Sequence, residues 1–153
     1  MRSMDEDIKF WLTQQGWYLG ETQIREIDEI EGIRVCVDSL DSRCLAYYER
    51  GKIYASRALV TFASLPQRRL AMLHELAHPR LNIKHLSLHD QEYACDRWAL
   101  QRMINSGDYT FRELLNAIGL FTASWFVEGD TKTHPASKKR YKRLYNQLME
   151  SVS

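Results

Sequence analysis

The chain lacks any long hydrophobic run, and it is poor in cysteine. No apolar stretch approaches the roughly 18–20 residues that a membrane-spanning helix needs, so we expect no membrane span. The first seven residues are acidic, and no apolar core with a small-residue cleavage site follows them, so we expect no signal peptide. Three cysteines cannot all pair, and reduced thiols in a cytoplasmic protein are the simpler interpretation.

The chain also lacks a net charge that would indicate a partner, because its formal charge is only +1. The charges are unevenly placed, however: the first third is rich in Asp and Glu, and residues 132–143 carry only positive charge. No repeat or low-complexity segment is present, and apolar and charged fractions of 44% and 27% are ordinary globular values. We therefore expect a single domain over residues 1–153, large enough to bury a core.

The first third of the chain changes its hydrophobic period. Apolar residues recur at helical spacing over residues 5–19, and isoleucines three apart favour a shorter helix over 22–31. Residues 1–32 are accordingly expected to be a helical extension of unknown role. Alternating, β-branched stretches then predict the strands of an antiparallel sheet, with turns at 38–43 and 50–52: residues 33–37, 44–49 and 53–56.

The rest of the chain has helical patterns. Ser64 and Gln67 stand at the positions of a capping box, and Pro66 fits the first turn of a helix that we expect to end at His78, before Pro79. Three further helices are predicted: residues 90–105, 111–120 (capped by Thr110) and 135–149, the last packing through Tyr141, Leu144, Tyr145 and Leu148. The predicted fold class is α+β, a small antiparallel sheet beside a helical core.

The pattern His74-Glu75-x-x-His78 lies in the first of these helices. Residues four apart are one helical turn apart, so both imidazoles are able to reach one zinc ion. Glu75 is offset around the helix, where its carboxylate would contact a water on the metal and act as general base. The alternative interpretation is two surface histidines on a helix.

The third metal ligand is expected from the following helix. The metzincin pattern would require Gly at position 81 and His at position 84, but the chain has Leu81 and Lys84. The gluzincin pattern takes a Glu from the next helix, and Glu92 stands fourteen residues after His78. Asp96 is one turn beyond Glu92, where it would orient a metal-bound imidazole. Glu92 and Asp96 also suit a solvated helix face.

Three further histidines remain to be explained. His85 and His89 are also four apart and compete as metal ligands, although their segment lacks helical patterning. His134 precedes the basic terminal helix, where it would donate a hydrogen bond to an oxyanion, with Arg140 anchoring it or pairing with an acid. The alternative here is a loop histidine followed by a solvated basic helix.

Three motifs in order, His-Glu-x-x-His, Glu92 to Asp96, and Thr-His-Pro with Arg six after the His, resemble the gluzincin metallopeptidases. Within them the chain is similar to the CAAX-prenyl-protease/HtpX-type family, over about residues 51–143. The segment 51–59 resembles that family's strand before the active-site helix. The chain lacks the membrane helices of the membrane members, and its short interval between the metal helix and Glu92 resembles the minigluzincins.

The resemblance implies a zinc-dependent endopeptidase in which one Zn²⁺ ion is held by His74, His78 and Glu92. It also implies that a peptide or protein substrate adds as a strand to the sheet edge near Tyr54. Two other interpretations stay open. One is a catalytically silent metal-stabilised module that uses its basic terminal helix to bind an acidic partner or, less expected, nucleic acid. The other is a latent peptidase that needs an activating partner.

Overall fold

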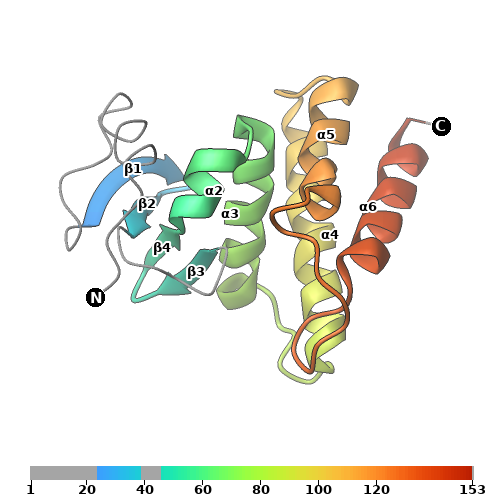
Figure 1. Cartoon of the computed structure of the whole chain (residues 1–153), viewed down its shortest axis with the longest axis horizontal. Coiled ribbons are helices and arrows are strands. Elements are labelled where there is room, and N and C mark those ends of the chain that lie inside the picture. The colour runs from blue at the N-terminus through green and yellow to red at the C-terminus, as the bar shows by residue number, and fades with distance from the viewer. Residues whose placement is uncertain (1–23, 39–45, 153) are drawn as a thin grey trace. The chain divides into compact units, whose positions relative to one another are not determined.

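The computed structural model describes residues 24–38 and 46–152, and these fall into two compact units that divide between Ala63 and Ser64 (Figure 1). The predicted helix over 5–19 and most of the predicted turn at 38–43 lie outside the described residues. The α+β class is confirmed: one four-stranded sheet and five α-helices make up the described part. The prediction of one domain over 1–153 stays a prediction.

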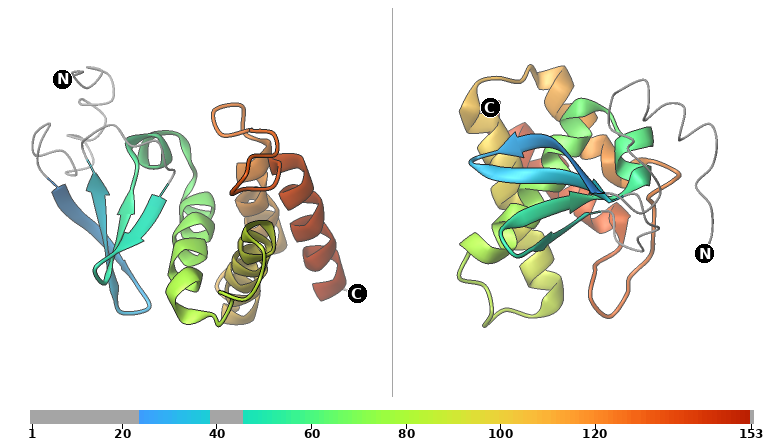
Figure 2. Two further views of the ribbon diagram at one scale, coloured as in Figure 1. Left: turned by 90° about the horizontal axis from the view of Figure 1, so that it is seen from below. Right: turned by 90° about the vertical axis from the view of Figure 1, so that its left-hand side faces the viewer.

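The first unit contains a twisted sheet with strand order β1-β2-β4-β3 (Figure 2). Its strands are β1 (Ile24–Ile30), β2 (Ile33–Asp38), β3 (Ala46–Glu49) and β4 (Lys52–Ala55). β1 pairs with β2 and β3 with β4 in antiparallel fashion, but β2 and β4 run parallel. The sheet is therefore two hairpins joined in parallel, which corrects the expectation of an entirely antiparallel sheet.

The prediction of a helix over residues 22–31 is wrong, because residues 24–30 form strand β1. A register shift between Glu26 and Asp28 adds one residue to the strand, so its sequence does not show two-residue alternation. Glu31 and Gly32, with φ of 49° and 82°, form the two-residue turn of a hairpin. In the sequence, Gly32 had instead indicated the end of a helix.

The segment 51–59, which resembles the strand before the active-site helix of the CAAX-prenyl-protease/HtpX-type family, contains a strand followed by the start of a short helix. β4 ends at Ala55, and Ser56 caps α2 (Arg57–Phe62) by accepting a hydrogen bond from the Leu59 amide at 3.1 Å. Leu59 and Val60 are buried. The predicted tight turn before β4 is confirmed, since Arg50 and Gly51 both have positive φ.

The second unit consists of four packed helices, of which α3 (Leu65–Arg80) carries the metal motif (Figure 1). The capping box of Ser64 and Gln67 is confirmed. The helix does not end at His78 as expected, but passes through Pro79. A proline in the last turn removes a single backbone hydrogen bond, and the Leu81 amide closes the turn on the Ala77 carbonyl at 2.9 Å.

Helix α4 (Leu88–Ser106) packs on α3, and both of its ends follow from local chemistry. Ser87 caps its start, and Gly107 ends it in the left-handed conformation at φ 72°. α5 (Phe111–Ile118) has the predicted Thr110 cap and continues as the 3₁₀ turn η1 (Gly119–Thr122). These elements and α6 (Ser137–Ser151) enclose a core of buried side chains: Leu70, Leu76, Leu100, Met103, Ile118, Leu120, Leu144 and Leu148.

Helix α6 turns a mixed face inward. Leu144 and Leu148 are buried as predicted, and each contributes about 1.5–3 kcal/mol by leaving water. Arg140 and Gln147 lie on the same face and are also buried. The expectation that Tyr145 packs inside is wrong, because this side chain is 40% exposed. The inward polar groups of α6 require partners on α4.

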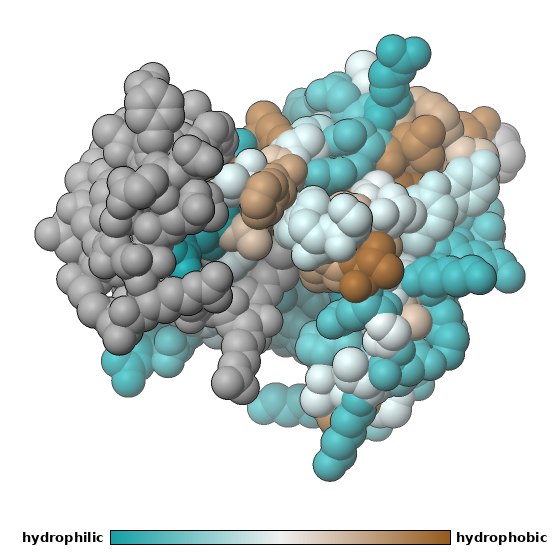
Figure 3. Space-filling model, viewed as in Figure 1, coloured by the Kyte–Doolittle hydropathy of each residue, from teal (hydrophilic) through white to brown (hydrophobic). Residues whose placement is uncertain are grey.

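The surface shown in Figure 3 is largely hydrophilic, with apolar side chains in small separate patches. The exposed large apolar residues come from several elements: Phe62, Leu65, Leu88, Phe111, Val127, Tyr145 and Val152. Among the helices that the structure describes, none combines the length and apolar character needed to cross a lipid bilayer.

Candidate metal centre

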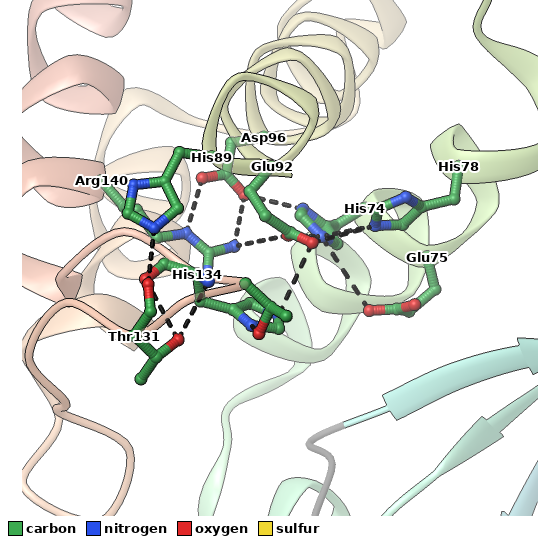
Figure 4. A network of polar contacts seen from close by, with 10 residues as sticks. His74, Glu75, His78, His89, Glu92, Asp96, Thr131, His134 and Arg140 are labelled. Atoms are coloured by element: carbon green, nitrogen blue, oxygen red, sulfur yellow. Dashed lines mark hydrogen bonds and ion pairs between the residues drawn. The ribbon is translucent and has the colours of Figure 1, made fainter. Parts of the chain in front are cut away.

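His74 and His78 lie on one face of α3, one turn apart (Figure 4). Their ring centroids are 5.0 Å apart with the rings nearly perpendicular, and their Nε2 atoms are 3.2 Å apart. His74 is buried and His78 is partly exposed. The two Nε2 atoms therefore face one small region at the surface end of a buried cluster.

Glu92 reaches the same region from α4. Its Oε2 lies 2.7 Å from His74 Nε2, and its Oε1 lies 3.5 Å from His78 Nε2. Oε2 is fully enclosed and has ion-pair contacts, but no well-aligned hydrogen bond among the described residues. A buried carboxylate oxygen without such a bond is costly unless a cation completes its environment.

The spacing of these atoms fits a metal ion. Ligand atoms about 2.0–2.1 Å from a tetrahedral ion stand about 3.3 Å apart. The 3.2 Å and 3.5 Å separations match this value, and the 2.7 Å separation is shorter. One atom each from His74, His78 and Glu92 lies within 4.8 Å of the others, and no other such group of His, Cys, Asp and Glu occurs in the described part of the chain.

Asp96 and Arg140 fix the orientation of His74 through Nδ1, the ring nitrogen that does not face Glu92. His74 Nδ1 lies 2.7 Å from Asp96 Oδ1, and Arg140 donates to both Asp96 oxygens, from Nε at 2.8 Å and Nη2 at 2.7 Å. Burial would raise the pKa of Asp96, but the Arg140 guanidinium outweighs burial and lowers it. The ionised Asp96 accepts the proton on Nδ1, which leaves Nε2 to face the other ligands.

The electrostatics of this cluster favour positive charge at its centre. Burial opposes the protonation of His74, yet the carboxylates of Asp96 and Glu92 outweigh it and raise the pKa of His74 to about 10. Burial would likewise raise the pKa of Glu92, but contact with the rings of His74 and His78 lowers it below its usual range. A position where carboxylates hold a proton so strongly is also a position that suits a metal cation.

Glu75 lies beside the cluster rather than inside it. Its Oε1 is 4.0 Å from His74 Nε2, at the edge of ion-pair distance (Figure 4). Burial raises the pKa of Glu75 above its ordinary value, although the neighbouring His74 and His78 act in the opposite direction. A carboxylate with a raised pKa is a stronger base than an exposed one.

His134 approaches the cluster from the loop before α6. Its Nε2 lies 3.5 Å from Glu92 Oε1, and the side chain is 44% exposed. Thr133 Oγ1 contacts the other ring nitrogen, Nδ1, at 2.7 Å. The structure thus brings together His74, Glu75, His78, Glu92, Asp96, His134 and Arg140 from three helices and one loop (Figure 4).

The remaining histidines lie outside the convergent group. His89 Nε2 contacts the Thr131 carbonyl at 2.6 Å, and His85 is exposed. Within the described residues neither joins the metal cluster, so their reading as competing ligands is not supported. Tyr54 stacks on Tyr47 at 4.9 Å in the first unit, and its role in substrate binding stays a prediction.

Sequence reasoning missed the residues that hold the His134 loop. Asp130 accepts hydrogen bonds from the Ala136 amide at 2.7 Å and from Lys139 Nζ at 2.6 Å, so it ties the loop to the residue before α6 and to the first turn of that helix. Asp130 stands six residues before Ala136, the N-cap residue of α6, so no N-cap pattern in the sequence indicated this contact. The contacts of Thr131 and Thr133 left no pattern in the sequence.

Comparison with known proteins gives one match. A model of the family described as Peptidase U49 matches residues 65–151, which include every residue of the metal cluster. No curated protein and no solved structure matches the chain.

Proposed function

The chain belongs to the peptidase U49 family, and from that premise we propose that it is a zinc-dependent endopeptidase of the gluzincin type. A peptidase acts on a peptide or protein, which gives the substrate class. The observation that supports a metal-dependent mechanism is the convergence of ligand atoms from His74, His78 and Glu92, which lie within 4.8 Å of one another, with Glu75 beside them.

Two imidazoles and one carboxylate are a ligand set that zinc accepts, with a fourth position left for water. A zinc ion held by His74, His78 and Glu92 would supply Lewis acidity, which lowers the pKa of a coordinated water from about 15.7 to about 7. Asp96 keeps the Nδ1 proton of His74, and Arg140 keeps Asp96 ionised. This support holds the imidazole in the tautomer that binds metal through Nε2.

Glu75 is the proposed general base. It accepts a proton from the attacking water as the water oxygen bonds to the peptide carbonyl carbon. It then passes that proton to the amide nitrogen as the carbon–nitrogen bond breaks, which releases an amine and a carboxylic acid. Its raised pKa makes Glu75 a better proton acceptor than an ordinary glutamate.

His134 is the proposed donor to the oxyanion that forms on the carbonyl oxygen. Its Nε2 faces the cluster at 3.5 Å from Glu92, and its partial exposure leaves room for a substrate. One well-aimed donor of this kind is worth about 3–4 kcal/mol of transition-state stabilisation. Addition of the substrate as a strand near Tyr54, and a cytoplasmic location, remain parts of the proposal.

The experiment measures metal content and peptidase activity in the same preparations. The number of zinc ions per chain is measured by inductively coupled plasma mass spectrometry. Cleavage is measured as the appearance of new termini in a proteome-derived peptide library. We expect about one zinc in the wild type, loss of zinc and cleavage in Glu92→Ala, and zinc without cleavage in Glu75→Gln. Asp90→Ala, which removes an exposed carboxylate two residues before Glu92, is the matched control and retains both.

A Glu92→Ala variant that keeps a full equivalent of zinc would overturn the ligand assignment. A Glu75→Gln variant that cleaves at the wild-type rate would remove Glu75 from the mechanism. Cleavage by the wild type that survives complete removal of metal by a chelator would overturn the metal-dependent reading, while leaving the family assignment intact.

A further inference from the structure

The His134 loop is a surface segment that cannot be held by burial. Residues 127–133 are all exposed, and the next buried side chain is Pro135. Hydrogen bonds must therefore fix the position of the loop, because little apolar area is removed from water there. The position of His134 relative to Glu92 depends on where those hydrogen bonds attach.

A closed turn surrounds His134. The Thr131 amide donates to the His134 carbonyl at 2.9 Å, and the His134 amide donates to Thr131 Oγ1 at 3.0 Å. These reciprocal bonds make residues 131–134 one unit, so a group that holds Thr131 also holds His134. Asp130 attaches this unit to α6 through the Ala136 amide and Lys139.

His89 attaches the same unit to α4. Its Nε2 lies 2.6 Å from the Thr131 carbonyl oxygen, which can only accept, so Nε2 carries a proton and donates (Figure 4). His89 and Glu92 are three residues apart on α4 and so share one face of a rigid helix. The anchor of the loop and the carboxylate that His134 faces are thereby held at a fixed distance by the same helix.

The contacts of the His134 ring suit a proton on Nε2. Thr133 Oγ1 lies 2.7 Å from Nδ1, and a hydroxyl that donates to Nδ1 leaves the ring proton on Nε2. That Nε2 atom is the one that faces Glu92 Oε1 at 3.5 Å. An oxyanion donor needs its proton on this atom.

We propose that His89 is a positioning residue, which ties the Thr131–His134 turn to the start of α4 and thereby holds the Nε2–H of His134 at the catalytic centre. The inference rests on the proposed function for its effect on turnover. The contact that it assigns is independent of that function, because it concerns the arrangement of the loop alone.

The test compares His89→Ala with His89→Gln, whose amide nitrogen replaces Nε2 as the donor to the Thr131 carbonyl. His85→Ala removes the exposed histidine four residues earlier and is the matched control. Three quantities are measured on the full chain with zinc: metal content, the ring ¹⁵N and ¹H shifts of His134 by NMR, and kcat and KM on a peptide identified from the library.

We expect His89→Ala to keep its zinc, to lower kcat about tenfold with KM within about twofold, and to move the His134 ring signals towards those of a freely exchanging imidazole. His89→Gln should restore most of kcat and the ring signals, and His85→Ala should match the wild type. A merely structural role would lower the melting temperature without this selective change in His134.

Wild-type kcat together with unchanged His134 signals in His89→Ala would overturn the proposal, and so would loss of zinc in that variant. If the wild type itself binds no zinc or cleaves nothing, the proposed function fails. The NMR comparison of His89→Ala with His89→Gln still decides whether His89 positions His134.

Discussion

Replacement of Asp96 by Asn tests the buried network that supports the metal centre. Asp96 is 3% exposed and Arg140 is 5% exposed, so both charges lie out of water. Oδ1 of Asp96 accepts from both His74 Nδ1 and Arg140 Nη2, whereas Oδ2 accepts from Arg140 Nε alone. In Asp96→Asn an amide oxygen keeps the first two contacts, but the amide NH₂ then faces the Nε–H of Arg140, donor against donor.

The magnitude follows from the charge that is left behind. Removal of one partner of a buried ion pair typically costs about 3–5 kcal/mol. The two retained contacts and the Glu92 Oε2 atom, 3.8 Å from Arg140, favour the lower end, so we expect a loss of about 3 kcal/mol in the free energy of unfolding. The free energy of unfolding of a typical domain is about 5–15 kcal/mol, so this loss is a large part of the total stability. Zinc affinity should fall about 10–100-fold, because the neutral amide that replaces the carboxylate makes the His74 imidazole a less basic metal ligand.

Urea unfolding of the metal-free protein at pH 7 gives the first quantity, and competition with a chromophoric chelator gives the second. Asp108→Asn, at an exposed carboxylate between α4 and α5, is the control and should change neither. A loss below about 1 kcal/mol would refute the argument for a buried pair that depends on Asp96. Unchanged zinc affinity would refute the argument that the negative charge of Asp96 strengthens His74 as a metal ligand.

Three further predictions concern separate parts of the second unit. The hydrogen bond from Lys139 lowers the pKa of Asp130, and the bond from the Ala136 amide lowers it further. Asp130 therefore contributes stability above its ordinary pKa, and this stability is lost as the pH falls through the lowered pKa. Carbon NMR should show the pKa of Asp130 rising towards its ordinary value in Lys139→Ala, and an unaltered pKa would contradict the pairing. Gly107→Ala should destabilise the protein by about 1 kcal/mol in thermal unfolding, because φ is 72° there, whereas a neutral result would mean that the helix end rearranges. His134→Phe should keep its zinc and lower kcat about 10²–10³-fold, and wild-type turnover would remove the oxyanion role.

The helices of the second unit could be predicted because their ends have local causes. Ser64 with Gln67, and Thr110 with Glu113, form capping boxes that are legible in the sequence. Strand β1 could not be recognised, because a bulge breaks its alternation and its turn residues suggested a helix end. The exit of α3 was missed because Pro79 disfavours, but does not forbid, one more turn.

The candidate site likewise contains residues that the sequence indicated and contacts that it did not. The spacing of His74 and His78 is a property of one helix, and the gluzincin pattern added Glu92 from the next helix, so the sequence was sufficient to propose these residues as a group. The attachment of His134 depends instead on contacts between residues far apart in sequence, such as His89 with Thr131. No periodicity encodes a side chain that binds a backbone carbonyl forty-two positions away.

The short connection between α3 and α4 has a consequence for the order in which the protein assembles. The three proposed ligands fall within nineteen consecutive residues, 74–92, on two helices that are neighbours in the chain. A helical hairpin of this kind closes only a small loop and needs no distant segment, so a cation held there would cross-link it at an early stage. The Arg140 contact with Asp96 spans forty-four residues, and we expect it to complete the support last.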